Sequence, residues 1–392
     1  FNIKELRPKQ IKEFIELQLD FVENKQNSIN KILEVIDQNS NREFKEYLSS
    51  PLLLSMFLFT FNSYPELPKK KSKFYWNVYE TLSSKHDSLT KKGFWQHERK
   101  SNLQSDEIEK VLGWFSYISL FNGQYSFEND YLYKTLNEIK NSLKLNCDVN
   151  DIIYDLTVSI SILVKDGLEY KFPHKSLQEY FTANLISKLP PDRKEEIYNK
   201  KMNKLRTHTL GGNQSFFNLC FELDKVSFSK GFIIKNSKKI LEPLKDLEGK
   251  EFICMYFKVF DIKLYFRENE NESGILYSTG IEYASFPENN VLNLFKLSNG
   301  YFLRIASEIP EEEMKKFLST KDDNKYSSKE KKEYCLKFDK CDDVNESLYQ
   351  LLLKYNIVKL AENNFINLTI KIEELEKEID EEIDTTNDLL NI

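Results

Sequence analysis

One short stretch, Gly167–Ile186, constrains this chain most, because two secondary-structure patterns meet in it without a linker. Tyr170 and Phe172 alternate with charged neighbours, as on a half-buried strand, and Pro173 ends that pattern. Apolar residues then follow helical spacing from Leu177 onward. The sequence therefore predicts a strand that leads directly into an amphipathic helix.

His174 lies at the start of this expected helix. We place it in the first turn, where unpaired backbone N–H groups and the positive end of the helix dipole favour an anion. A histidine at that place can donate a hydrogen bond to a phosphate. The alternative is a surface or capping histidine, which needs no ligand.

The residues around His174 resemble a known motif. Phe172, His174, Glu179, Tyr180 and Ala183 form the string Phe-x-His-x-x-x-x-Glu-Tyr-x-x-Ala. This string resembles the winged-helix segment of NACHT-type STAND NTPases, the switch ATPases that include animal NOD-like receptors and bacterial antiphage relatives. The resemblance implies that His174 contacts the β-phosphate of bound ADP and holds the molecule closed. It also implies ADP or ATP as the cofactor, with Mg²⁺ supplied at an upstream ATPase core.

A second candidate contact is Pro51. Ser50 can cap a helix, and proline is favoured at the first helical position, where no N–H is required. A capped, buried helix explains every residue of this segment. The resemblance adds that Pro51 packs against the adenine of the nucleotide. We assign no catalytic residue and no metal-binding residue.

The periodicities predict a mainly α fold in four parts, and the resemblance covers the first three. Residues 1–90 form a NACHT-associated helical domain, and residues 91–190 form a winged-helix domain with a short β-wing. A second helical domain covers residues 191–247. A small α+β domain with an acidic tail follows at 248–392, and we take it as the sensor. The resemblance itself ends near residue 240.

Within the winged helix we expect a helix that opens at Ser105, a short strand at 125–127 and a helix over Asn150–Leu163. In the last part, aromatic and β-branched residues indicate strands over Phe252–Phe260, Lys263–Phe266, Gly274–Phe286 and Gly300–Ile305. Helices are expected over Glu311–Leu318 and Val344–Leu353. The acidic tail is expected to be a solvated terminal helix, with a partner-docking or autoinhibitory helix as the alternative.

Charge and composition exclude several classes of protein. The net charge is −6, and Glu373–Asp384 carries eight carboxylates against one lysine, so the rest of the chain is near +1. A nearly neutral body argues against a dedicated nucleic-acid binder. The five cysteines contain no C-x-x-C pair, which favours a reducing cytosol. The longest apolar run, Pro51–Phe61, is too short for a membrane span.

A winged-helix transcription regulator is the rival interpretation. Its recognition helix would carry Lys or Arg toward phosphates and base edges. The expected helix Asp151–Leu163 has neither, and it carries Asp151 and Asp155 instead. A helical scaffold, in which the histidine motif arises by coincidence, is the third alternative.

The eleven glycines include no G-x-x-x-x-G-K-[ST] motif, so the phosphate cradle of an ATPase is expected upstream of these residues. The resulting prediction is the regulatory and sensor part of a cytoplasmic NACHT switch that acts in bacterial antiphage defence. Its expected partners are the upstream core, a trigger molecule that is a protein rather than a nucleic acid, and further copies of itself. No membrane partner is expected.

Overall fold

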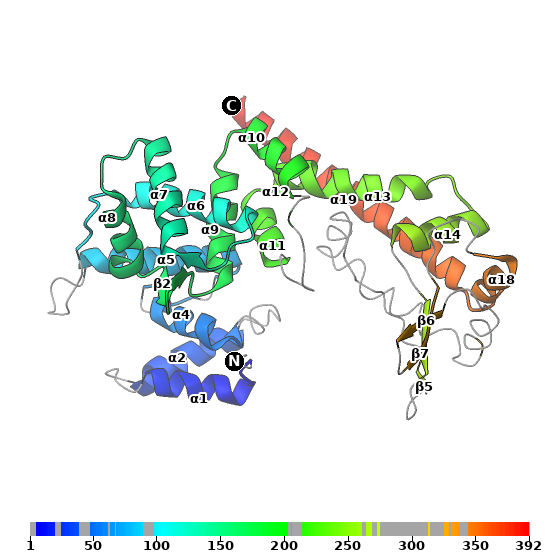
Figure 1. The fold of residues 1–392 in the computed structure, drawn as a ribbon, viewed down its shortest axis with the longest axis horizontal. Coiled ribbons are helices and arrows are strands. Elements are labelled where there is room, and N and C mark those ends of the chain that lie inside the picture. The colour runs from blue at the N-terminus through cyan, green and yellow to red at the C-terminus, as the bar shows by residue number, and fades with distance from the viewer. Residues whose placement is uncertain are drawn as a thin grey trace. The chain divides into compact units, whose positions relative to one another are not determined.

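The computed structural model divides the chain into two compact units, Phe1–Lys188 and Leu189–Ile392. It describes residues 5–19, 25–38, 48–61, 63–66, 68–88, 98–202, 205, 214–260, 264–268, 273–274, 313, 325–328, 331–336 and 344–391. Most of these residues are helical (Figure 1), which confirms the predicted mainly α class. The division into four domains stays a prediction.

The described residues at the start of the first unit are mainly helical. Their helices are α1 (Pro8–Gln18), α2 (Lys25–Gln38), α4 (Pro51–Phe61) and α5 (Lys71–Ser88). α1 starts with a proline at its first position, where the missing N–H has no cost. Its Ile15 is buried, as are Ile29 and Ile32 of α2, so these apolar residues form packing faces.

The rest of the first unit has the element order of a winged helix. The elements are α6 (Ser105–Phe121), β1 (Phe127–Glu128), α7 (Asn129–Leu143), α8 (Val149–Tyr154), the π-helical turn η2 (Asp155–Ser159), β2 (Val164–Asp166), β3 (Glu169–Lys171) and α9 (Lys175–Ser187). The three strands form an antiparallel sheet in the order β1-β3-β2. Gly167, with φ of +65°, makes the turn between β2 and β3, a conformation that favours glycine.

The elements of this region differ in part from the prediction. α7 was not predicted, although Leu132, Leu136 and Ile139 are buried at helical spacing. The expected helix over Asn150–Leu163 ends earlier, because η2 stops at Ser159 and β2 begins at Val164. The strand that leads directly into a helix is present as β3 and α9.

The second unit is also mainly helical. Its helical elements are α10 (Pro191–Glu196), η3 (Ile197–Lys201), α11 (Gln214–Leu223), α12 (Lys225–Phe228), η5 (Ser229–Ile234), α13 (Lys235–Leu241), η6 (Glu242–Leu244), α14 (Gly249–Val259), α18 (Glu346–Lys354) and α19 (Ile357–Leu390). Four antiparallel strands pair in the order β5-β4-β7-β6: β4 (Leu264–Glu268), β5 (Ser273–Gly274), β6 (Lys325–Ser328) and β7 (Lys331–Leu336). The expected helix over Val344–Leu353 corresponds to α18.

One predicted strand is a helix. Residues Phe252–Phe260 lie in α14 and its carboxy-terminal cap, because Phe252, Ile253, Tyr256 and Phe257 recur at helical spacing and are all buried. The expected strand Lys263–Phe266 overlaps β4. The predicted elements at 275–286, 300–305 and most of 311–318 lie outside the described residues.

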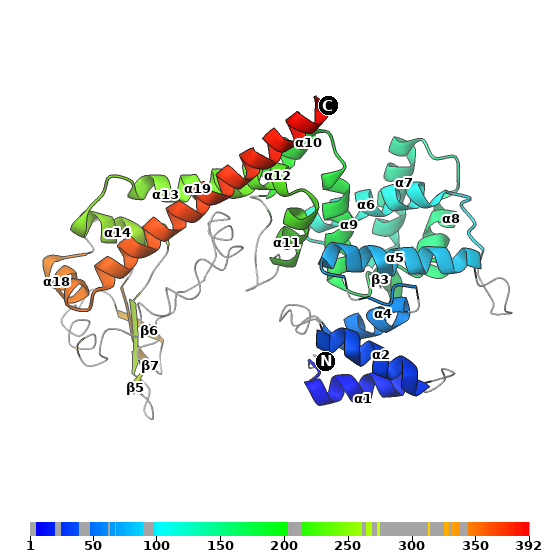
Figure 2. The same ribbon diagram turned by 180° about the vertical axis from the view of Figure 1, so that it is seen from behind.

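The acidic tail is a helix, as expected, but one face of it is packed as far as Ile379 rather than solvated. α19 is one helix of 34 residues that lies along α12, η5, α13 and α14, as both ribbon views show (Figures 1 and 2). Its Leu368, Ile372, Leu375 and Ile379 form a buried row. The apolar spacing inside the acidic segment is therefore a packing face rather than a surface feature.

A close contact joins α10 and η3 to the rest of the second unit. A Cβ built on Gly231 of η5 would lie 2.9 Å from the Cβ of Tyr198 of η3. The Tyr198 hydroxyl donates a hydrogen bond of 3.0 Å to Asp224, and Lys194 lies 3.1 Å from the same carboxylate oxygen. These contacts fix residues 191–201 against the helices that follow.

We predict that Gly231→Ala destabilises the second unit by about 1–3 kcal/mol, because the added methyl group forces two backbones apart. Thermal unfolding and hydrogen exchange of η3 measure the effect. Lys235→Ala, on an exposed position of the adjacent helix α13, is the matched control and should change stability by less than about 0.5 kcal/mol. Equal stability of both variants would show that η3 is not held against η5.

Candidate functional site

An aromatic cluster fixes the junction between β3 and α9. The buried ring of Phe172 lies 6.4 Å from Phe115, 6.1 Å from Phe127 and 6.4 Å from Phe181, measured between ring centroids. These partners come from α6, β1 and α9. These ring contacts join elements that are distant in sequence, so they fix the position of the chain at the end of β3. The positions of the next two residues, Pro173 and His174, follow from it.

His174 is the N-cap of α9 and not part of its first turn, which corrects the prediction. Its backbone is extended, with φ of −140° and ψ of 138°. Its Nδ1 accepts a hydrogen bond of 3.2 Å from the backbone N–H of Ser176 and lies 2.5 Å from the Ser176 hydroxyl. The imidazole therefore satisfies one of the N–H groups that a helix start leaves unpaired.

This cap has a consequence for the other ring nitrogen. Burial lowers the pKa of His174, and the charge of Lys175 lowers it further, so the imidazole is neutral at neutral pH. A neutral imidazole whose Nδ1 accepts carries its proton on Nε2. Nε2 makes no hydrogen bond to any described residue. The capping histidine thus keeps one N–H donor for a ligand oxygen.

The first turn of α9 also holds a positive charge. The Lys175 ammonium lies 3.2 Å from the carboxylate of Glu179, whose side chain is 3% exposed. The same ammonium lies 5.0 Å from the centre of the Tyr125 ring. Lys175 and Glu179 therefore form a partly buried ion pair beside His174. The glutamate of the motif is thus already paired with a residue of its own helix.

Tyr180 of the motif and its neighbour Phe181 pack α9 against α5. Tyr180 lies 5.7 Å from Tyr75 between ring centroids, and Phe181 lies 5.3 Å from Tyr79. Burial raises the pKa of the Tyr180 hydroxyl, with Glu109 as the next cause. These ring contacts and the burial of both side chains fix Tyr180 and Phe181 in the core.

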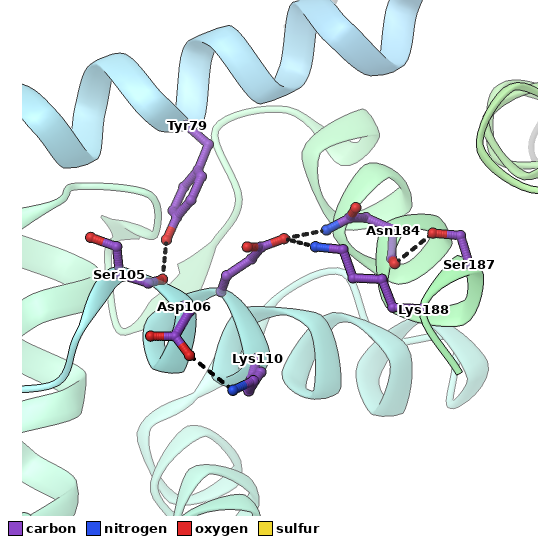
Figure 3. Close-up of polar contacts among 8 residues, drawn as sticks. Tyr79, Ser105, Asp106, Lys110, Asn184, Ser187 and Lys188 are labelled. Atoms are coloured by element: carbon purple, nitrogen blue, oxygen red, sulfur yellow. Dashed lines mark hydrogen bonds and ion pairs between the residues drawn. The ribbon is translucent and has the colours of Figure 1, made fainter. Parts of the chain in front are cut away.

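Polar contacts at the other end of α9 join it to α6 (Figure 3). Asn184 donates a hydrogen bond of 2.6 Å to the Glu109 carboxylate, which also pairs with Lys188. Tyr79 of α5 donates a hydrogen bond of 3.1 Å to the backbone carbonyl of Ser105 at the start of α6. These contacts were not predicted, since a sequence shows no pairing between residues this far apart.

Gln178 is a further residue that the sequence did not single out. Its amide nitrogen donates to the Ser119 hydroxyl at 2.8 Å and to the Gln124 carbonyl at 2.9 Å. The side chain is buried and lies one turn after His174. It ties α9 to the end of α6 and holds the start of α9 in place.

Pro51 lies where the sequence placed it, at the first position of α4. It is half-buried, and its carbonyl accepts a hydrogen bond of 3.0 Å from the Ser55 hydroxyl. Among the described residues, no hydrogen bond or ion pair joins Pro51 to His174. Its adenine contact stays a prediction.

The position of a DNA recognition helix is occupied by α8 and η2. The acidic residue Asp155 there is fully buried, and its carboxylate accepts hydrogen bonds from the backbone N–H of Lys100 at 2.7 Å and of Ser101 at 3.0 Å. The Asp155 charge therefore does not lie on the exposed surface of this helix. Asp155 organises the loop before α6, and Val149–Ser159 still contains no Lys or Arg.

The described part of the chain contains no helix that is both long and apolar enough to cross a bilayer. Comparison with known proteins identifies one region. Residues 223–390, fewer than half of the chain, match the model of the Short NACHT-associated C-Terminal domain, family 8 (SNaCT8). No curated protein matches the chain. The chain therefore carries a NACHT-associated carboxy-terminal region, which begins at the end of α11 and includes α19.

The capping role of His174 predicts a distinct effect of substitution. His174→Ala removes the cap and should destabilise the first unit by about 0.5–2 kcal/mol, whereas His174→Ser keeps a good cap and should cost little. Chemical denaturation and hydrogen exchange at the start of α9 measure both variants. Equal losses would mean that the imidazole contributes by packing rather than by capping.

The lowered pKa of His174 predicts a pH dependence. The folded state binds this proton less readily than the unfolded state, whose histidine pKa is about 6.5. The stabilisation is therefore complete above about pH 6.5 and is lost as the pH falls through the folded pKa. NMR titration of the four histidines should give His174 a lower pKa than 6.5, and His174→Ser should remove its part of the pH dependence.

Proposed function

We propose that this chain is the regulatory and sensor part of a NACHT STAND NTPase, a switch that ADP holds closed. The observation that carries the proposal is the NACHT-associated region at 223–390, which follows a winged helix with a histidine at the start of α9. A partner ATPase core belongs with such a region. In this proposal, exchange of ADP for ATP opens the protein and permits self-association.

His174 is proposed as the contact to the β-phosphate of ADP. Its Nε2–H is a directed donor at the N-terminus of a 13-residue helix, where the dipole favours an anion. Burial favours the neutral imidazole in the ligand-free chain, so the side chain offers an N–H donor rather than a positive charge to the incoming phosphate. Bound ADP would supply the charged phosphate, and the chain would supply the His174 N–H donor. Ser176 and the packed Phe172 hold this imidazole in one orientation.

The proposed trigger site is the second unit, and the proposed setting is bacterial antiphage defence in the cytoplasm. SNaCT8 names a carboxy-terminal association with NACHT, and a carboxy-terminal region is where such a switch would meet its trigger. A winged-helix transcription regulator is the weaker alternative, since α8 and η2 offer no cation toward DNA phosphates.

We predict that His174→Ala in the full-length protein, with its ATPase core, releases ADP faster. A hydrogen bond to a charged group contributes about 1.5–3 kcal/mol, so the release rate should rise roughly 10- to 100-fold. His174→Ser is the key comparison, because it keeps the cap and removes the Nε2 donor. Stopped-flow release of a fluorescent ADP analogue measures the rates.

Both variants should also be active, or toxic to cells, without a trigger. Fast release by His174→Ala with normal release by His174→Ser would assign the effect to helix capping. Normal release by both folded variants, from a protein shown to bind ADP, would refute the phosphate contact.

A separate prediction concerns Pro51. Pro51→Asp should lower nucleotide affinity, because an unpaired charge is unfavourable against an apolar adenine. Its effect on stability should be small, since an acidic residue in the first turn suits the helix dipole. Isothermal titration and thermal unfolding separate the two effects. Unchanged affinity with altered stability would leave Pro51 as a helix-start proline.

A further inference from the structure

The two halves of α19 are held in different ways. In the proximal half, the Asn364 amide donates a hydrogen bond of 2.6 Å to the buried Tyr256 hydroxyl, and the ring of Phe365 lies 5.8 Å from that of Phe252. Both partners belong to α14. A buried polar pair fixes one register, because a shift of the helix would leave both groups unsatisfied.

In the distal half, exposed ion pairs flank a narrow apolar row. Leu375 and Ile379 are buried, and no described residue after Ile379 is. Four cross-helix ion pairs accompany this row: Glu376 with Lys238 at 2.6 Å, Glu378 with Lys225 at 2.8 Å, Asp380 with Lys230 at 3.0 Å and Glu382 with Lys225 at 3.4 Å.

The spacing of these carboxylates along α19 shows on which side of the buried row each partner lysine lies. Glu376 and Asp380 lie one turn apart on one side of the buried row, and Glu378 and Glu382 lie one turn apart on the other side. Lys225 therefore stands on one side of the row, and Lys230 and Lys238 stand on the other. We call the surface of α12, η5 and α13 between these lysines the lysine-walled groove.

We propose that the lysine-walled groove is a binding site for an acidic amphipathic helix of a partner protein, and that the distal half of α19 is its resident occupant. The occupant shows the required chemistry: apolar residues four apart with carboxylates on both sides. Exposed ion pairs hold it weakly and are screened by salt. A partner helix of the same pattern can therefore displace it while the proximal half stays in register.

This inference names a partner class for the second unit and does not depend on nucleotide binding. A full-chain variant with Glu376→Gln, Glu378→Gln, Asp380→Asn and Glu382→Gln weakens the resident helix. Its matched control carries Glu373→Gln, Glu374→Gln, Asp384→Asn and Asp388→Asn, which remove the same charge from exposed positions that have no ion pair with α12, η5 or α13.

The first measurement is hydrogen exchange over residues 373–390. Exchange should be about tenfold faster in the weakened variant than in the control, and residues 357–368 should stay protected in both. Equal exchange in the two variants would mean that the ion pairs do not hold the distal half, and would overturn the proposal.

The second measurement is binding of a labelled peptide with the sequence of residues 368–391, by fluorescence anisotropy. The weakened variant should bind it at least about tenfold more tightly than the wild-type chain, because the competing helix is released. A peptide with amides at 376, 378, 380 and 382 should bind poorly, as should a weakened variant that also carries Lys225→Glu and Lys238→Glu.

Equal binding of both peptides, or no binding by a variant whose distal half exchanges rapidly, would overturn the proposal. Dimerisation of the weakened variant without peptide binding would overturn it as well, because the groove would then take α19 of a second copy.

Discussion

The burial of α9 along nearly its whole length is the constraint on which the first unit depends. All residues from Ser176 to Ile186 are buried, although they include Gln178, Glu179, Thr182 and Asn184. A buried polar group without a partner is costly, so each must meet a complementary atom. Those atoms come from α6, the loop after it and α9 itself, which leaves α9 one position between α5 and α6.

The fixed position of α9 also fixes the orientation of its N-cap, His174. Because α9 cannot rotate or slide, its N-terminus has one position. The packed Phe172 in turn fixes the backbone that leads into α9. His174 therefore holds one orientation, with Nδ1 used by the helix and Nε2 left for a ligand. The same imidazole serves stability and the proposed contact, which is why the serine variant is needed to separate the two.

In the second unit, buried contacts and exposed ion pairs hold different parts of one helix. Its long helix α19 is fixed at one end by buried polar and aromatic contacts with α14, and at the other by exposed ion pairs around a short apolar row. Buried contacts specify register, while exposed pairs contribute little and respond to salt. One continuous helix thus combines a fixed anchor with an end that a competitor can replace.

The sequence by itself determined the elements whose pattern is local. The strand-to-helix junction at His174, the helix that opens at Ser105 and the helix after Val344 follow from spacing and capping residues within a few positions. Only the tertiary structure decided the fate of Asp155, which is buried against Lys100 and Ser101, and of the acidic tail, whose carboxylates meet lysines about 140 to 157 residues away in the chain. Charge on a residue predicts exposure unless a distant partner compensates for its burial, and no local pattern reveals that partner.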